Sequence, residues 1–348
     1  MTKILRKNKV YDEGTVLLTT LLVMAIMAAL AVAMIDDIRF ALKRTANVTD
    51  YAQADWYVLG AEDYVSDVLA ATLNTVEDNT AKNETLRTIN PLILPLDDGA
   101  MSLNIRDGSH CFNLTSLTNV TTGEMNEDAQ LYFIQTMDAL GVPLSEAERL
   151  HAKLTDWADK DQQSLPGGAE DGDYLRRQPP LRTANAPFAS VMEIRAVEGV
   201  TQELYDALRP WLCIAGAEAG NKFNINLAEP WQAPLLAGLL GGADALPLAT
   251  QLILERPPQG YDESLTENPL LQNSGIEDIT GRISQTVSYA PNSLWVELNL
   301  SYRKAQRARS FHFNIDNDRP VLTYRGWGRE SFRLILRPES ETQESYRR

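Results

Sequence analysis

The 348-residue sequence is poor in the residues that build metal and redox centres. It contains two cysteines, Cys111 and Cys213, and three histidines, His110, His151 and His312. No CxxC pair and no cysteine–histidine cluster occurs, which excludes the common zinc and thiol-redox motifs. Patterns for a nucleophilic serine (GxSxG), a zinc protease (HExxH) and a phosphate-binding loop are also missing. We therefore expect no enzymatic activity.

Positive charge is scarce as well. The chain has 32 lysines and arginines against 47 aspartates and glutamates, a formal net charge of −15. Nucleic-acid binding needs a cationic surface to neutralise phosphates, so no nucleic-acid partner is expected. The segment AVEGV at 196–200 resembles the turn of a helix-hairpin-helix, but acidic residues dominate its flanks, and it is interpreted as a structural module.

Charge is absent from residues 16–35, where Thr19 and Thr20 carry the only polar side chains. Twenty helical residues span about 30 Å, the thickness of a bilayer core. Four basic residues precede this run, and Asp36 and Asp37 follow it. Because positive charge stays on the cytoplasmic side, the pattern predicts a single-pass membrane helix with a cytoplasmic N-terminus and the remaining chain outside.

Two interpretations of this apolar run stay open. As a secretory signal it would end at the small residues 31–33, although it is longer than the usual 7–15 apolar residues. Alternatively, cleavage follows Gly14 and the helix stays attached. Beyond the run, apolar residues continue at spacings of three and four, which favours one helix over 16–76 that is apolar all round first and amphipathic later.

The rest of the chain predicts an α+β fold. Residues 99–110 alternate apolar and polar side chains and indicate a half-buried strand. More strands are expected over 284–328, with a hairpin turn at 314–320. Residues 113–279 have helical texture, and the polar stretch 74–86 is expected to be a loop. Within the helical region, CFNLTSL at 111–117 and KFNINLA at 222–228 look alike and are interpreted as paired entries to the helical domain.

These features together resemble a known family. A basic leader ending in Gly14, a long N-terminal helix, a strand, a large helical insertion and a returning sheet resemble the K-type minor pseudopilins of type II secretion, the GspK family. The stretches CFNLTSL, DWADKDQQSLPGGAEDGDYL and ANAPFASVMEIRAVEGVTQELYDALRPWL look like recurrent stretches of that family.

The resemblance implies an architecture in which a pilin-like long N-terminal helix packs on an antiparallel β-sheet that carries a large inserted all-α domain. The expected parts are a cleaved cytoplasmic leader at 1–14, a transmembrane or filament-core helix at 15–36, a pilin-like α/β domain at 37–112 and 280–330, the inserted helical domain at 113–279, and a flexible tail at 331–348.

The resemblance also implies a processing site and partners. A prepilin peptidase would cut between Gly14 and Thr15, and the new amine of Thr15 would be methylated. The chain would lie in the bacterial inner membrane with its globular part in the periplasm. Its partners would be the I-type and J-type minor pseudopilins, the peptidase and other type II secretion components.

Thr19 is the fifth residue after this cut, where most members of the pilin family have Glu. That Glu is thought to pair with the terminal amine of a neighbouring subunit, which Thr cannot do; Thr bonds back to its own helix. An ionised carboxylate without a partner is expensive in apolar surroundings. We therefore expect a non-enzymatic subunit at the filament tip, which initiates or caps the pseudopilus. The alternatives are a diverged or inactive pilin, or a signal-anchored periplasmic binding or hydrolytic protein with an uncleaved tether helix.

One acidic stretch predicts a cation site. From Asp159, oxygen-bearing side chains stand at the first, third and fifth places and Glu170 at the twelfth, as in part of an EF-hand loop, although Ser164 replaces the usual glycine. The family resemblance implies calcium as a possible cofactor; the alternative is a solvated acidic loop. The candidate ligands are Asp156, Asp159, Asp161, Glu170, Asp171 and Asp173.

Export would also bear on the two cysteines. Outside the cytoplasm, Cys111 and Cys213 are expected to form one disulfide. The alternative is two independent buried thiols. A bond between them would close a loop of about 100 residues, nominally worth about 4–5 kcal/mol in the chain-entropy model, and would tie the start of the insertion to its middle.

Overall fold

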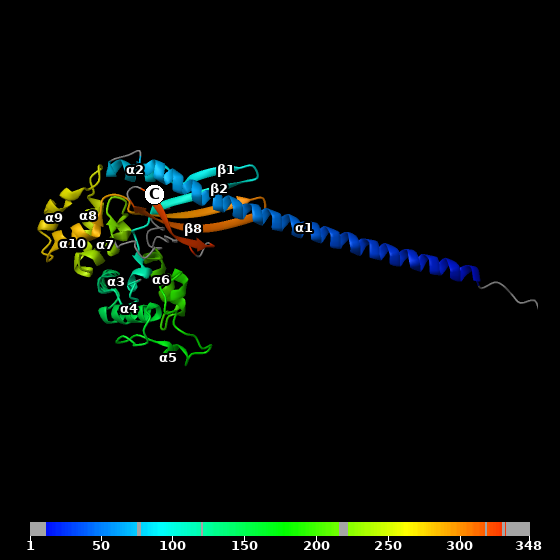
Figure 1. Cartoon of the computed structure of the whole chain (residues 1–348), viewed down its shortest axis with the longest axis horizontal. Coiled ribbons are helices and arrows are strands. Elements are labelled where there is room, and N and C mark those ends of the chain that lie inside the picture. Colours follow the sequence, from blue (N-terminus) through cyan, green and yellow to red (C-terminus); the bar gives the residue numbers. More distant parts are fainter. Residues whose placement is uncertain are drawn as a thin grey trace, which may run out of the picture.

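A computed structural model describes residues 12–74, 78–119, 121–215, 222–316, 319–328 and 331. Its dominant feature is the helix α1, Asp12–Asn74, which projects far beyond a two-part body (Figure 1). Sixty-three residues at 1.5 Å each give a length of about 95 Å. The single long helix expected from the sequence is confirmed. Most of the leader and the tail from 332 lie outside the described residues.

The sheet domain holds the C-terminal half of α1. Its five strands are antiparallel in the order β1-β2-β7-β8-β9. Their bounds are β1 Leu92–Leu96, β2 Gly99–Asp107, β7 Ser293–Tyr302, β8 Ala305–Asp316 and β9 Arg319–Trp327. The expected hairpin is confirmed as the β8–β9 pair.

Helix α1 packs on this sheet through one stripe of apolar residues. The buried members follow helical spacing: Ala54, Val58, Ala61, Val65 and Leu69. They meet alternate residues of β2, β7 and β8, which face the same side of the sheet. The antiparallel sheet beneath a long helix confirms the pilin-like α+β architecture.

An ion pair fixes the register of helix and sheet. The guanidinium of Arg307 on β8 donates two hydrogen bonds to the carboxylate of Asp55 on α1, with Nη2–Oδ2 at 2.9 Å and Nε–Oδ1 at 2.5 Å. This bidentate contact holds the pKa of Asp55 below its usual value, chiefly through the hydrogen bond from Arg307. Arg325 on β9 makes a similar contact with Glu62, about two turns further along α1.

The structure corrects two local expectations. The polar stretch 74–86, expected to be a loop, contains most of helix α2, Asn79–Thr88, because Asp78 caps its N-terminus by accepting a hydrogen bond from the Ala81 amide at 3.1 Å. The strand expected from residue 284 is shortened to β6, Val287–Ser288, and residues before it form helix α10, Ile279–Thr286. Ile279 and Ile283 lie one helical turn apart and bury that face of α10.

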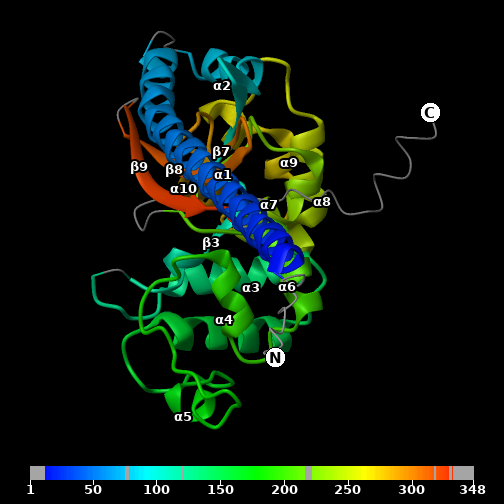
Figure 2. The ribbon, with the colours of Figure 1, turned by 90° about the vertical axis from the view of Figure 1, so that its right-hand side faces the viewer.

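The helical domain lies at the end of the sheet away from the free half of α1 (Figures 1 and 2). Its α-helices before α10 are α3 Glu127–Ala139, α4 Leu144–Ala158, α5 Asp171–Tyr174, α6 Gln202–Leu208, α7 Ala233–Leu240, α8 Leu246–Leu254 and α9 Pro269–Gln272. Short 3-10 turns join them: η1 Leu114–Leu117, η2 Val191–Ala196, η3 Arg209–Trp211, η4 Pro230–Gln232, η5 Ala243–Ala245 and η6 Glu263–Glu267. Helices α3 and α7 cross closely at Gly238, where a Cβ would lie 2.1 Å from Thr136 Oγ1.

The two similar Phe-Asn segments take the same local structure. Each forms a two-residue strand in a parallel pair: β3 Phe112–Asn113 with β4 Leu212–Cys213, and β5 Phe223–Asn224 with β6. Next to β3, Cys111 forms a disulfide with Cys213, with Cα atoms 5.8 Å apart. The first pair lies at the entry to the helical domain, and the second lies where the chain leaves it for the sheet.

Candidate cation site

The candidate processing site lies at the start of α1. The backbone of Gly14 and Thr15 is helical, and the Thr15 side chain is exposed. Thr19 Oγ1 donates to the Val16 carbonyl at 2.9 Å, and Thr20 Oγ1 donates to Leu17 in the same way. The hydroxyl of Thr19 is thus satisfied within its own helix.

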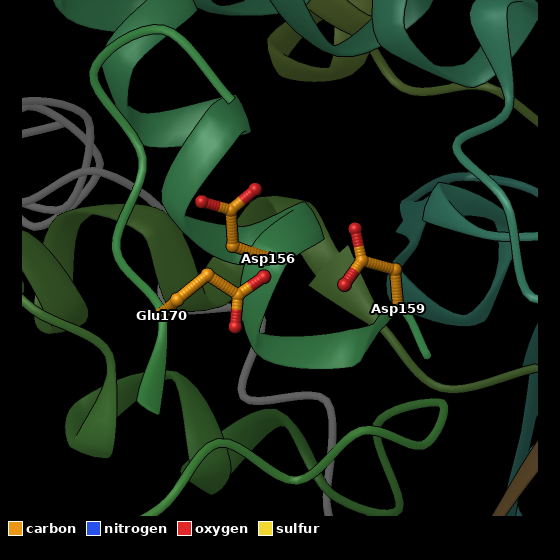
Figure 3. Close-up of side chains that lie close together, drawn as sticks. All are labelled: Asp156, Asp159 and Glu170. Atoms are coloured by element: carbon orange, nitrogen blue, oxygen red, sulfur yellow. The ribbon is translucent and has the colours of Figure 1, made fainter. Parts of the chain in front are cut away.

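Three of the six acidic candidates converge in the helical domain. Asp156 lies in the last turn of α4, Asp159 is the C-cap residue directly after α4, and Glu170 directly precedes α5. Figure 3 shows the three side chains lying close together. One oxygen from each lies within 4.8 Å of the others, and all three residues are buried.

The loop between α4 and α5 is fixed by aromatic packing. The rings of Trp157 and Tyr174 meet edge-to-face with centroids 5.2 Å apart. Tyr174 Oη accepts a hydrogen bond from the Glu198 amide at 2.9 Å, which ties α5 to the segment before α6. This packing brings Glu170 back over the end of α4.

The cluster is electrostatically unfavourable as it stands. Asp156 accepts hydrogen bonds from Ser164 Oγ at 3.0 Å and from the Leu165 amide at 3.2 Å, whereas Oδ1 of Asp159 is buried without a donor among the described residues. None of the three acids forms an ion pair with a described lysine or arginine. A buried carboxylate oxygen without a donor, among other carboxylates, is costly, and a bound cation could satisfy it.

The pKa values of all three carboxyl groups are raised, as expected for buried acids close to one another. Burial, together with the nearby charges of Asp161 and Glu170, raises the pKa of Asp159 to about 7. Burial and the charge of Asp156 raise the pKa of Glu170 to about 7. Burial also raises the pKa of Asp156. Three carboxylates that resist joint ionisation fit a divalent cation with oxygen ligands, for which calcium is well suited.

The other three acidic candidates have different surroundings. Asp161 is exposed, and its Oδ1 accepts from the Gln163 amide at 2.7 Å. Asp171 accepts from the amide and hydroxyl of Thr183 and pairs with Arg182 at 3.2 Å. Asp173 pairs with Arg176 and accepts from the Glu170 amide. Of the EF-hand places, the cluster therefore contains only the first, Asp159, and the twelfth, Glu170. Its third member, Asp156, comes from the preceding helix.

Comparisons with known proteins agree with this architecture. The family model described as "Type II secretion system (T2SS), protein K" matches residues 110–217, which include the acidic cluster and both cysteines. Type II secretion system protein K of Klebsiella pneumoniae is 33% identical over 273 residues, covering 76% of this chain and 81% of that protein. Protein K of Aeromonas hydrophila is 34% identical over 264 residues, covering 72% and 77%.

A solved structure shares the fold. The GspK-GspI-GspJ complex from the type 2 secretion system of enterotoxigenic Escherichia coli contains a chain that matches with a TM-score of 0.66 and 24% identity, covering 82% of this chain and 99% of that chain. The extent of the curated matches settles the family: the chain belongs to the type II secretion system protein K family, the K-type minor pseudopilins.

Proposed function

We propose that this chain is the non-enzymatic tip subunit of the type II secretion pseudopilus, where it initiates or caps the filament. The observation that carries the proposal is the hydrogen bond from the Thr19 hydroxyl to the Val16 carbonyl. The side chain at this position is neutral and is satisfied within its own helix, so it places no carboxylate near the start of the mature helix. A subunit with no neighbour ahead of it has no amine to neutralise such a carboxylate. An unpaired charge in apolar surroundings is costly, so a neutral residue suits the first position in the filament.

The proposal includes maturation and topology. Cleavage between Gly14 and Thr15 by a prepilin peptidase, followed by methylation of the Thr15 amine, would leave the apolar half of α1 at the very N-terminus. The candidate span within α1 is long and apolar enough to cross a membrane. The proposal assigns it to the inner membrane and the globular part to the periplasm. N-terminal sequencing and mass spectrometry test this step. A mature chain that begins at Thr15 supports it, whereas an uncut Met1 or a start near Asp36 supports the tethered alternative.

Its proposed partners are minor pseudopilins of the I and J types, because the solved relative was crystallised with GspI and GspJ. Immunogold electron microscopy of assembled pseudopili tests the position of the chain. We expect the label at one end only; label spread along the fibres would refute a tip role.

A pair of variants at one position tests the physical reason. Thr19→Glu places an unpaired carboxylate in the apolar segment and is expected to reduce incorporation into filaments. Thr19→Val removes only a hydroxyl that bonds its own helix and is expected to assemble normally. Normal assembly of Thr19→Glu would mean that the missing carboxylate does not define the tip.

We also propose that Asp156, Asp159 and Glu170 hold a calcium ion that stabilises the helical domain. Calcium accepts six to eight oxygen ligands in irregular geometry, so three carboxylates with backbone oxygens and water suit it. The buried Oδ1 of Asp159, which has no hydrogen-bond donor among the described residues, supports this assignment.

A further inference from the structure

A pocket of about 280 Å³ lies where the sheet domain meets the helical domain. It is separate from the acidic cluster of α4 and α5. Three arginines from distant parts of the chain line it: Arg87 from α2, Arg106 from β2, and Arg256 from the segment after α8. In a chain with a net charge of −15, this concentration of positive charge at one pocket needs an explanation.

The Arg256 guanidinium donates hydrogen bonds to described residues through only one of its three nitrogens. Its Nη1 donates to the carbonyl oxygens of Ile225 at 2.9 Å and Ala228 at 2.8 Å. Its Nε and Nη2 have no acceptor among the described residues, and it forms no ion pair with them. These contacts fix the guanidinium in place while leaving part of its fork available for a ligand.

Arg106 and Arg87 add positive charge that the described residues leave largely unpaired. Nε of Arg106 is buried and has no partner among the described residues. Arg87 donates from Nη2 to the Asn226 carbonyl at 2.9 Å, and its only ion pair with a described residue, Glu84, is 3.9 Å long and exposed. Such exposed pairs contribute little. Burial lowers the pKa of the Arg256 guanidinium, and the nearby positive charge of Arg87 lowers it further.

Two acids line the same pocket, and both accept hydrogen bonds from neutral donors. Asp107 accepts from Ser109 and from Asn224 Nδ2, the latter at 2.9 Å. Glu229 accepts from Trp231 Nε1 at 2.8 Å. Because neither Arg106 nor Arg256 is paired with a described carboxylate, the arginine side of the pocket retains positive charge.

We propose that this pocket binds a small oxyanion, a phosphate or carboxylate group, between the guanidinium groups of Arg87 and Arg256, with Arg106 adding positive charge. Guanidinium groups recognise both classes through paired, charge-assisted hydrogen bonds. The bound group would bridge α2 of the sheet domain and the segment after α8 of the helical domain. It would therefore also strengthen the junction between the two domains.

The test uses the full chain in detergent without added calcium, with inorganic phosphate and succinate as probes and sodium chloride to keep the ionic strength constant. Ligand binding to the folded state raises the melting temperature, and we expect a rise of at least about 2 °C for a bound probe. Calorimetry gives the affinity. A response to phosphate alone identifies a phosphate-bearing ligand, a response to succinate alone identifies a carboxylate, and a response to both supports the shared chemistry.

Matched variants localise the effect. Arg87→Gln and Arg256→Lys are each expected to weaken probe binding at least about tenfold, because each loses part of a paired contact. Arg319→Gln removes one exposed charge on β9 outside the pocket and is expected to bind normally. Arg87 is partly exposed, so its variant keeps the test valid if Arg256→Lys fails to fold. The proposal is overturned if neither probe raises the melting temperature above chloride, or if Arg319→Gln loses as much affinity as the pocket variants.

Discussion

The carboxylate of Asp156 occupies the space beside Gly168, where a Cβ would lie 2.0 Å from Oδ2. The Pro-Gly-Gly turn at 166–168 thus passes directly over the end of α4, and only a residue without a side chain allows the approach. This contact places Glu170 two residues later beside the same carboxylate (Figure 3). The spacing of the cluster therefore depends on a glycine that contributes no ligand.

Gly168→Ala is expected to lower calcium affinity about tenfold or more, because the added Cβ would push the Asp156 carboxylate away by about 1 Å or more and disturb the coordination. Isothermal titration calorimetry measures the change. Gly172→Ala is the matched control, since a Cβ at 172 meets only Arg176 Nη1 at 3.9 Å. Wild-type affinity in Gly168→Ala would contradict the proposed role of this close contact.

Asp159→Asn is expected to abolish the rise in melting temperature that calcium produces, because it removes a buried ligand charge. A ligand at a hundred times its dissociation constant stabilises by about 2.7 kcal/mol, which a thermal melt with calcium and with chelator detects. Asp161→Asn, in the same loop but exposed, should keep most of the rise. If the unmodified chain melts at the same temperature in both conditions, calcium does not bind here.

The calcium effect should grow as pH rises from 5 to 8. Asp159 and Glu170 have pKa values raised to about 7, so in the calcium-free chain their contribution to stability is present below the unfolded-state values and is lost as pH rises through about 7. Calcium binds the deprotonated carboxylates and reverses that loss. Melting curves across this range, with and without calcium, measure the difference. An equal calcium effect at both ends of the range would be inconsistent with these pKa values.

Cys111→Ser with Cys213→Ser is expected to destabilise the chain by about 2–5 kcal/mol, because the disulfide joins residues 102 positions apart and holds β3 beside β4. Urea unfolding gives the free energy. A reducing agent should destabilise the unmodified chain and leave the double variant unchanged. Two titratable thiols in the unfolded, unreduced protein would rule out the bond.

The sequence predicted the parts of the fold that depend on long periodic patterns. Helix α1 was expected over 16–76 and runs over Asp12–Asn74, because its apolar spacing is sustained over many turns. Helix α2 was missed because its buried face carries Lys82 and Asn83. Tertiary contacts stabilise it, such as the hydrogen bond from Asn83 Nδ2 to the Tyr289 carbonyl at 2.9 Å.

Strand β1 was missed for a different reason. It contains Pro95, which argues against a central strand, and β1 lies at the edge of the sheet, where proline is tolerated. In the acidic loop, the spacing of the carboxylates identified the stretch that contains the cluster. It could not separate the three residues that converge from the three that bind other partners. That separation depends on partners such as Arg182 and Thr183, which draw Asp171 away.

The apolar half of α1 packs against no other described part of the chain, and the large apolar side chains from Val16 to Leu42 are exposed. Each large aliphatic group brought from lipid into water costs about 1.5–3 kcal/mol. Withdrawal of this segment from the bilayer is therefore prohibitive unless helices of other subunits replace the lipid as it leaves. If the chain takes the proposed tip position, its extraction from the bilayer and its attachment to other subunits would occur together, and its rise would be limited by the arrival of the subunits beneath it.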